Sequence, residues 1–316
     1  MTVHTPAARS KPGRSPLRRH EIRWGLTFIA PWLLGFSLFF AAPMALSFSY
    51  AFTDYNLLAP GPPSFIGLAN WRQMLVDPAV RQSLGVTMRF LALAVPVGMA
   101  LPLLFALLVN SRYLRGRRVF RTLFYLPTMV PLVAGAMIWR GVLNQQSGWV
   151  NRLLEWFGVP APGPAWLSDS ALAIPTLTLV GIWGVGGAML VMLAGLQNIP
   201  GELYDAARVD GAGPLRSFAA ITLPLLSPVL FYQLVLTTIG ALQEFLRALI
   251  IYSESTGAGP ENAALFYMVN LYREAFVYFK MGYASALAWG LFLVALLITV
   301  ALFASASRWV YYASER

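Results

Sequence analysis

Few side chains in this chain can carry catalytic or metal chemistry. There is no cysteine, and the two histidines, His4 and His20, lie in a polar segment near the start. No buried metal site or imidazole base is therefore expected. Neither lysine, Lys11 or Lys280, follows a glycine, so the Gly-Lys-Ser/Thr loop that cradles nucleotide phosphates is missing. We expect a chain that binds no cofactor and does not itself hydrolyse ATP by such a loop.

The richest cluster of charged and turn-forming residues lies between residues 197 and 224. Pro200 and Gly201 interrupt one apolar helix, and Gly211 is placed to end a short helix in the left-handed conformation. Pro214 suits the first position of the next helix. By spacing alone, the segment can also be an ordinary amphipathic connector.

The short helix predicted here carries negative charge in its first turn, from Glu202 and Asp205, where the helix dipole favours it. Leu203, Ala206 and Ala207 follow the spacing of one helical face. Two alanines on that face would let another surface approach closely.

Polar and aromatic side chains at or near the apolar segments are candidates for a path through the molecule, because ionisable groups at membrane depth are costly and often line such paths. Two alternatives stay open. The arginines fit side chains that extend to a membrane surface, and tryptophan at such a surface is a common anchor. The candidate residues are Arg89, Trp183, Gln243, Glu244 and Arg247.

The elements that must position these residues are membrane spans. The chain is 58% hydrophobic and only 11% charged, whereas a soluble domain carries about 25% charged residues. A helical span takes about 20 apolar residues, and no segment alternates as a barrel strand does. We therefore predict an all-α polytopic membrane protein with six spans, over residues 24–48, 90–111, 122–139, 170–201, 217–243 and 281–307.

Basic residues predict the orientation. Six lie within residues 1–23 and five within residues 112–121, whereas each long loop on the other side carries two, apart from Arg89 and Arg247 at or near span ends. Short loops rich in lysine and arginine stay in the cytoplasm, so both termini are predicted to be cytoplasmic. The net charge of +10 is spread in clusters between spans, so nucleic-acid binding is not expected. The first apolar stretch exceeds the roughly 7–15 residues of a signal-peptide core and is predicted to be retained.

The chain divides into three parts on this basis. Residues 1–23 form a basic cytoplasmic tail, residues 24–307 a transmembrane domain, and residues 308–316 a second cytoplasmic tail. The loop over residues 197–224 belongs to the transmembrane domain and faces the cytoplasm. In an outer loop, residues 149–157 are expected to form a short interfacial helix.

The loop over residues 197–224 closely resembles the cytoplasmic EAA loop of binding-protein-dependent ABC importer permeases. That pattern is Glu-Ala-Ala, three residues, Gly, and later Ile-x-Leu-Pro. It differs here in one residue, an aspartate where glutamate is usual. The matching residues are Asp205, Ala206, Ala207, Gly211, Ile221, Leu223 and Pro224.

Three weaker motifs follow the family's order. Residues 65–71 look like its first outer-loop signature, residues 257–260 stand where Gly-Gly-Pro is usual, and residues 275–286 look like the start of its last helix. The chain as a whole is similar to carbohydrate-type permeases, such as those of the maltose and glycerol-3-phosphate systems.

The resemblance implies a type I ABC importer transmembrane fold in a prokaryotic inner membrane. It implies four kinds of partner: a second permease subunit, usually a different chain; two ATP-binding subunits that hold ATP and Mg²⁺; an extracytoplasmic solute-binding protein; and a sugar or oligosaccharide as solute. The resemblance also implies which loop residues contact the ATP-binding subunits: Glu202, Asp205, Ala206, Ala207, Asp210 and Gly211.

Two other classes of function are alternatives. A self-sufficient secondary transporter or channel would move solute alone, on an ion gradient. An intramembrane enzyme would need a pair of catalytic groups at membrane depth, and the sequence offers no convincing pair.

Overall fold

The structure is a computed structural model that describes residues 16–111 and 113–311, with side chains from residue 20 onward. Residues 1–15 and 312–316 of the two predicted tails lie outside the described residues. Within the described ranges every regular element is a helix, and the one strand-like pairing is an isolated bridge between Thr53 and Phe65. The predicted all-α class is confirmed.

Four continuous helices are long and apolar enough to cross a membrane. They correspond to the first, second, fifth and sixth predicted spans. The first joins α1 (Pro16–Phe36) to α2 (Ala42–Tyr50) through a π-helical turn (Ser37–Ala41). The others are α4 (Pro78–Asn110), the run of α11 (Pro214–Ser217), π-helix η4 (Phe218–Thr222) and α12 (Leu223–Leu242), and α15 (Met281–Ala306).

The second span begins at residue 78 rather than at the predicted residue 90. Its start carries a proline in the first turn and an aspartate cap, because Asp77 accepts a hydrogen bond of 2.8 Å from the N–H of Ala79. Residues 78–89 include polar side chains such as Arg81, so hydropathy alone did not identify them as part of the span.

The third and fourth predicted spans are bent pairs of helices and not continuous helices like the other four. In the third, α5 (Arg117–Tyr125) and η2 (Leu126–Met129) meet α6 (Leu132–Val142) at 99°. Pro131 explains the break, since Val130 before it is extended at ψ 126. In the fourth, η3 (Ser170–Leu172) and α8 (Ala173–Ile182) meet α9 (Gly186–Gln197) at 55°. Counting each pair as one span gives six spans among the described residues.

The long helix α4 lies at the centre and packs against α8, α9, α12 and α14 (Tyr267–Tyr272). Near its middle, Phe90 meets Phe266 edge to face, with ring centroids 5.1 Å apart. A second buried cluster joins α9 to α12 and includes Met189, Met192 and Leu226. Such close van der Waals packing is what associates helices in lipid, where burial of apolar surface provides little driving force.

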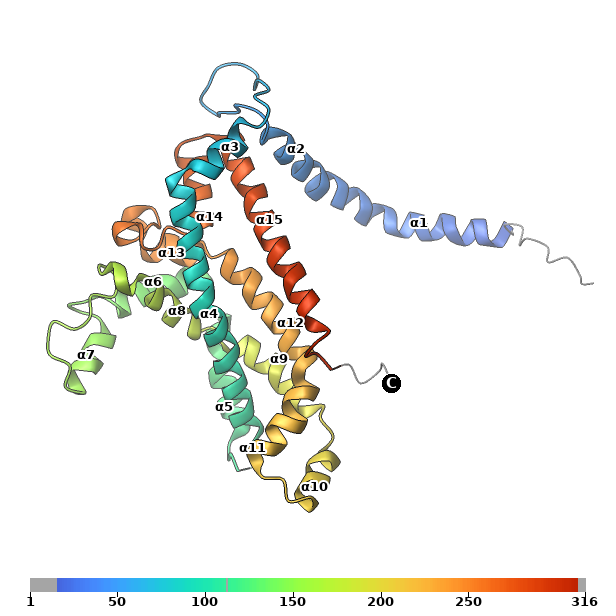
Figure 1. The fold of residues 1–316 in the computed structure, drawn as a ribbon, viewed down its shortest axis with the longest axis vertical. Coiled ribbons are helices and arrows are strands. Elements are labelled where there is room, and N and C mark those ends of the chain that lie inside the picture. Colours follow the sequence, from blue (N-terminus) through green and yellow to red (C-terminus); the bar gives the residue numbers. More distant parts are fainter. Residues whose placement is uncertain (1–15, 112, 312–316) are drawn as a thin grey trace, which may run out of the picture.

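The two ends of the bundle differ in build (Figure 1). One end holds α3 (Ala69–Val76), α14, π-helix η7 (Arg273–Val277) and the loop over residues 51–68, which the Asn70 side chain ties down by donating to the carbonyls of Ala51 and Thr53. The opposite end holds α10 (Gly201–Val209) and α11. The remaining short elements are α7 (Trp149–Trp156), which confirms the helix expected over residues 149–157, α13 (Leu246–Ile251), η5 (Ser253–Ser255) and η6 (Pro260–Asn262).

The first helix leans away from the rest of the bundle (Figure 1). Only its second part is held: α2 packs against α15, where Phe48 meets Trp289 with ring centroids 4.8 Å apart. None of the most apolar window of residues 20–50 is buried inside the chain, whereas the other three continuous spans bury 22–28% of theirs. An apolar helix of this kind needs lipid or another protein around it.

Candidate functional site

The segment that the sequence singles out forms a projecting hairpin of two short helices at one end of the bundle (Figure 1). Pro200 caps α10 with an extended backbone (ψ 132), so the chain leaves α9 at an angle. Pro214 starts α11, as expected, and α11 runs without interruption into η4 and α12. The short helix α10 is therefore fixed between the two long elements α9 and α12.

Gly211 ends α10 in the conformation that was predicted for it. Its φ is +74°, in the left-handed region that favours glycine. The N–H of Gly211 donates to the carbonyl of Arg208 at 3.1 Å, and the N–H of Ala212 donates to that of Ala207 at 2.8 Å. These two bonds form a Schellman motif, which gives α10 a defined end rather than a frayed one.

The outer surface of α10 is apolar in the middle and charged at its border. Leu203, Ala206 and Val209 are exposed, Val209 to 88%, while Ala207 is half-buried and so leaves the face predicted for it. Among the charged residues, Asp205 pairs with Arg208, and Glu202 and Asp210 are exposed. Exposed apolar side chains on a short, well-capped helix are typical of a docking surface.

The inner surface of α10 is joined to the start of α12 by one side-chain hydrogen bond. The hydroxyl of Tyr204 lies 2.8 Å from that of Thr222, in a partly buried setting. Thr222 is only 5% exposed and ends the π-helical turn that leads into α12. A displacement of α10 therefore reaches α12 through this contact as well as through the backbone.

Two cavities lie at the middle of the bundle and form the second part of the candidate site. One, of about 280 Å³, is lined by α4, α8, α9 and α12. The other, of about 510 Å³, lies against η2, α6 and the break between α8 and α9. Gly181, Gly184 and Arg247 contribute to both walls, so the two cavities are neighbours.

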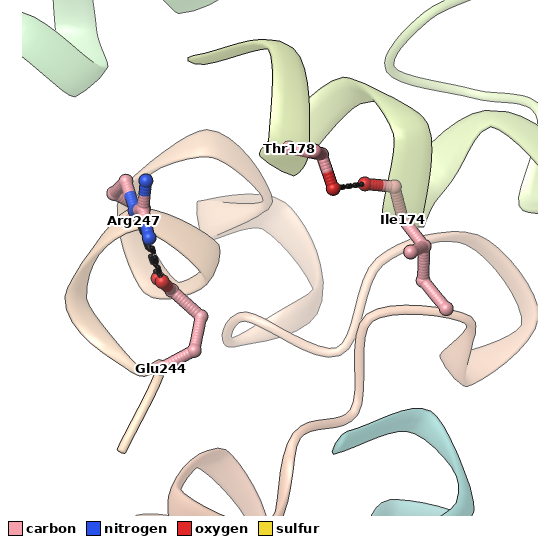
Figure 2. A network of polar contacts seen from close by, with 4 residues as sticks. All are labelled: Ile174, Thr178, Glu244 and Arg247. Carbon is pink, nitrogen blue, oxygen red and sulfur yellow. Dashed lines mark hydrogen bonds and ion pairs between the residues drawn. The ribbon is translucent and has the colours of Figure 1, made fainter. Parts of the chain in front are cut away.

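The break between α12 and α13 brings a buried ion pair to this shared wall (Figure 2). Glu244, 5% exposed, accepts two hydrogen bonds from Nε of Arg247, at 3.0 and 3.2 Å, and a further contact from Nη2. Arg247 faces α8, where the Thr178 hydroxyl donates a hydrogen bond to the carbonyl of Ile174. The three-residue spacing across the break holds the two side chains together.

The structure divides the five predicted path residues into two groups. Arg247 and Trp183 line cavities, and Glu244 lies directly behind Arg247. Gln243 and Arg89 are exposed and line neither of the two cavities; Arg89 donates to the carbonyl of Gly85 within its own helix. A role in transport stays a prediction for all five.

Two polar residues of the cavity wall were missed from the sequence. Gln233 and Thr237 line the smaller cavity, and the Gln233 amide donates to the Thr237 hydroxyl at 3.2 Å. Their spacing of four residues within an apolar helix places them on one face, which is the signal that could have identified them.

The comparisons with known proteins agree with this geometry. The family described as "Binding-protein-dependent transport system inner membrane component" matches residues 98–316. The chain is 40% identical to the probable ABC transporter permease protein YesP of Bacillus subtilis, covering 92% of this chain and 93% of that one. It is 34% identical to the trehalose/maltose transport system permease protein MalF of Thermococcus litoralis, covering 85% and 87%.

A solved structure has the same architecture. It is a chain of a bacterial alginate ABC transporter in complex with an alginate pentasaccharide-bound periplasmic protein, with a TM-score of 0.81, 25% sequence identity, and coverage of 94% of this chain and 98% of that one. The family match spans α10, the larger cavity and most of the wall of the smaller one. This chain belongs to the family of binding-protein-dependent transport system inner membrane components, and it is a permease subunit of an ABC importer.

Proposed function

We propose that this chain forms one half of the path for a sugar or oligosaccharide through a prokaryotic cytoplasmic membrane, driven by separate ATP-binding subunits. The observation that carries the proposal is the connection of a docking helix to the cavity wall. The helix α10 is fixed between α9 and α12, and both of these line the smaller cavity. A partner that moves α10 therefore changes the shape of that cavity.

The named relatives support a carbohydrate as solute. They include transport-system permeases for arabino-oligosaccharides and for trehalose/maltose, besides the alginate transporter. The larger cavity, of about 510 Å³, lies within the range of roughly 300–1,000 Å³ that small-molecule sites occupy. Trp183 and Trp139 stand at its wall, where aromatic faces suit the apolar face of a sugar ring.

The partners follow from the surfaces that the chain leaves uncovered. The apolar face of α10 is assigned to an ATP-binding subunit that holds ATP and Mg²⁺, with two such subunits in the complex. The uncovered first helix is consistent with a second permease subunit, which we take to be a different chain. The end of the bundle opposite α10 then faces a solute-binding protein, with both termini of this chain in the cytoplasm.

The test places a large side chain on the docking face. Ala206 is exposed, so Ala206→Trp leaves the bundle intact but holds an ATP-binding subunit away from α10. We expect loss of co-purification with the ATP-binding subunits and at least a tenfold fall in ATP-driven sugar uptake. The matched control is Ala301→Trp, at an exposed position on α15, which should behave as wild type.

A second measurement separates the proposal from a self-sufficient transporter. The chain alone in proteoliposomes should move no sugar on an ion gradient. The complete complex should take up sugar when ATP is supplied. Uptake by the chain alone, or wild-type uptake by Ala206→Trp, would contradict the proposed function.

A further inference from the structure

We propose that Arg247 recognises a carboxylate on the solute, so that the transported class is an acidic oligosaccharide, one that contains uronic acid residues. This inference rests on the proposed function and goes further, because it names a chemical group of the solute and the side chain that binds it. Three features of the cavity wall carry it.

The first feature is the charge of the wall. Among the described residues, Arg247 is the one charged side chain that lines either central cavity, and no aspartate or glutamate lines them. Glu244, its partner, is 5% exposed and belongs to neither wall. A solute in either cavity therefore meets the guanidinium and not the carboxylate behind it.

The second feature is the set of N–H groups that the ion pair leaves free. A guanidinium has five N–H donors in a planar fork. Glu244 engages Nε and Nη2 (Figure 2), and no hydrogen bond from Nη1 is found among the described residues. The edge formed by Nη1 and the outer N–H of Nη2 has the geometry that binds a carboxylate through two parallel hydrogen bonds.

The third feature is the space that the chain leaves for this edge. A methyl group added at Gly181 would lie 2.6 Å from Nη1 of Arg247, and Gly181 lines both cavities. The absent side chain lets the guanidinium lie against α8 and reach the shared wall. The hydroxyl of Thr178 is already bonded to a backbone carbonyl, so it does not compete for the solute.

Arg247 and Glu244 already balance each other's charge. The preference for an anionic solute therefore rests on the N–H donors that the pair leaves free, because charge-assisted bonds to a carboxylate are stronger than bonds to a neutral hydroxyl. Gln233 and Thr237 on the same wall remain to bind hydroxyl groups, which the acidic and the neutral sugars share.

The experiment uses the complete importer in proteoliposomes with its solute-binding protein. The probes are oligogalacturonates and oligomannuronates of two to four residues, each beside its carboxyl-reduced neutral counterpart. Uptake by each variant is divided by wild-type uptake of the same probe, which removes the preference of the solute-binding protein. The variants are Arg247→Lys and the double variant Glu244→Gln/Arg247→Gln, which leaves no buried charge unpaired.

Loss of one charge-assisted bidentate contact corresponds to a change of roughly 10- to 100-fold in affinity. We therefore expect the double variant to raise the half-saturating concentration of the acidic probe by roughly that factor, and to change that of the neutral counterpart less than threefold. Arg247→Lys keeps the charge but lacks the fork and should fall between. Gly181→Ala, which displaces the guanidinium and removes no charge, should weaken uptake of the acidic probe selectively.

The outcomes are distinct. If wild type transports only neutral oligosaccharides, or if the double variant affects acidic and neutral probes equally, carboxylate recognition is refuted while the sugar importer stands. If no carbohydrate is taken up with ATP in any form of the complex, the proposed function itself fails.

Discussion

The hydrogen bond between Tyr204 and Thr222 predicts a specific defect in coupling. Tyr204→Phe removes one oxygen and keeps the ring, so α10 retains its packing. The Thr222 hydroxyl, 5% exposed, then loses the partner that lies 2.8 Å away. An unsatisfied buried hydroxyl costs about 1–3 kcal/mol, and a coupling energy of that size corresponds to about 5–150-fold.

The assay measures transport and ATP hydrolysis in the same proteoliposomes. For Tyr204→Phe we expect ATP-binding subunits to co-purify as in wild type. We expect sugar uptake per ATP hydrolysed to fall at least about fivefold, because a movement of α10 is then transmitted less completely to α12. Thr222→Val should give a similar defect, and the double variant should be no worse than either single one, since both remove the same contact.

Tyr232→Phe is the matched control, because Tyr232 lies on α12 and is 55% exposed. It should leave uptake unchanged. Wild-type coupling in Tyr204→Phe, or strictly additive losses in the double variant, would show that motion passes from α10 to α12 without this hydrogen bond.

Three further predictions concern the backbone and one loop. Gly211→Val places a β-branched residue at φ +74°; we expect roughly 1–3 kcal/mol of strain and loss of ATP-driven uptake with a correctly inserted chain, measured against Gly213→Val. Gly186→Ala would bring a methyl group within 2.0 Å of the Phe124 carbonyl oxygen, so the detergent-solubilised chain should lose roughly 1–3 kcal/mol in thermal unfolding, and an unchanged midpoint would refute that close approach. Hydrogen bonds from Ser64 lower the pKa of Asp54 below its usual 3.8; the stabilisation is present above the usual pKa and is lost as pH falls through the lowered one, so Ser64→Ala should raise the pKa of Asp54 in an NMR titration.

Local signals in the sequence were sufficient for much of the fold and for the short helix α10. Pro200, Gly211 and Pro214 act through their own backbone restrictions, which do not depend on the rest of the molecule. The structure confirms the ends that they predict. Long apolar stretches likewise identified the spans, because a run of about 20 apolar residues is long enough to cross the hydrocarbon core as a helix.

The cavity was less predictable, because hydropathy does not say which face of a helix points inward. Adjacent residues of a helix differ in direction by roughly 100°. At the end of α12, Gln243 is exposed while Glu244 is buried, and the choice depends on the break that starts at Gln243. Gln233 and Thr237 line the cavity only because residues of α4 and α8 surround the same space as this face of α12.

The position of the first helix has a consequence for how the protein is made. Residues 20–50 are synthesised before the other described spans, yet none of their most apolar window is buried inside the chain. Their apolar surface must lie in lipid or against another polypeptide. A subunit synthesised in excess would keep this helix uncovered, which is a feature that membrane proteases can use to remove unassembled copies. Balanced production of the subunits would then be enforced after synthesis, through the lifetime of the unassembled chain.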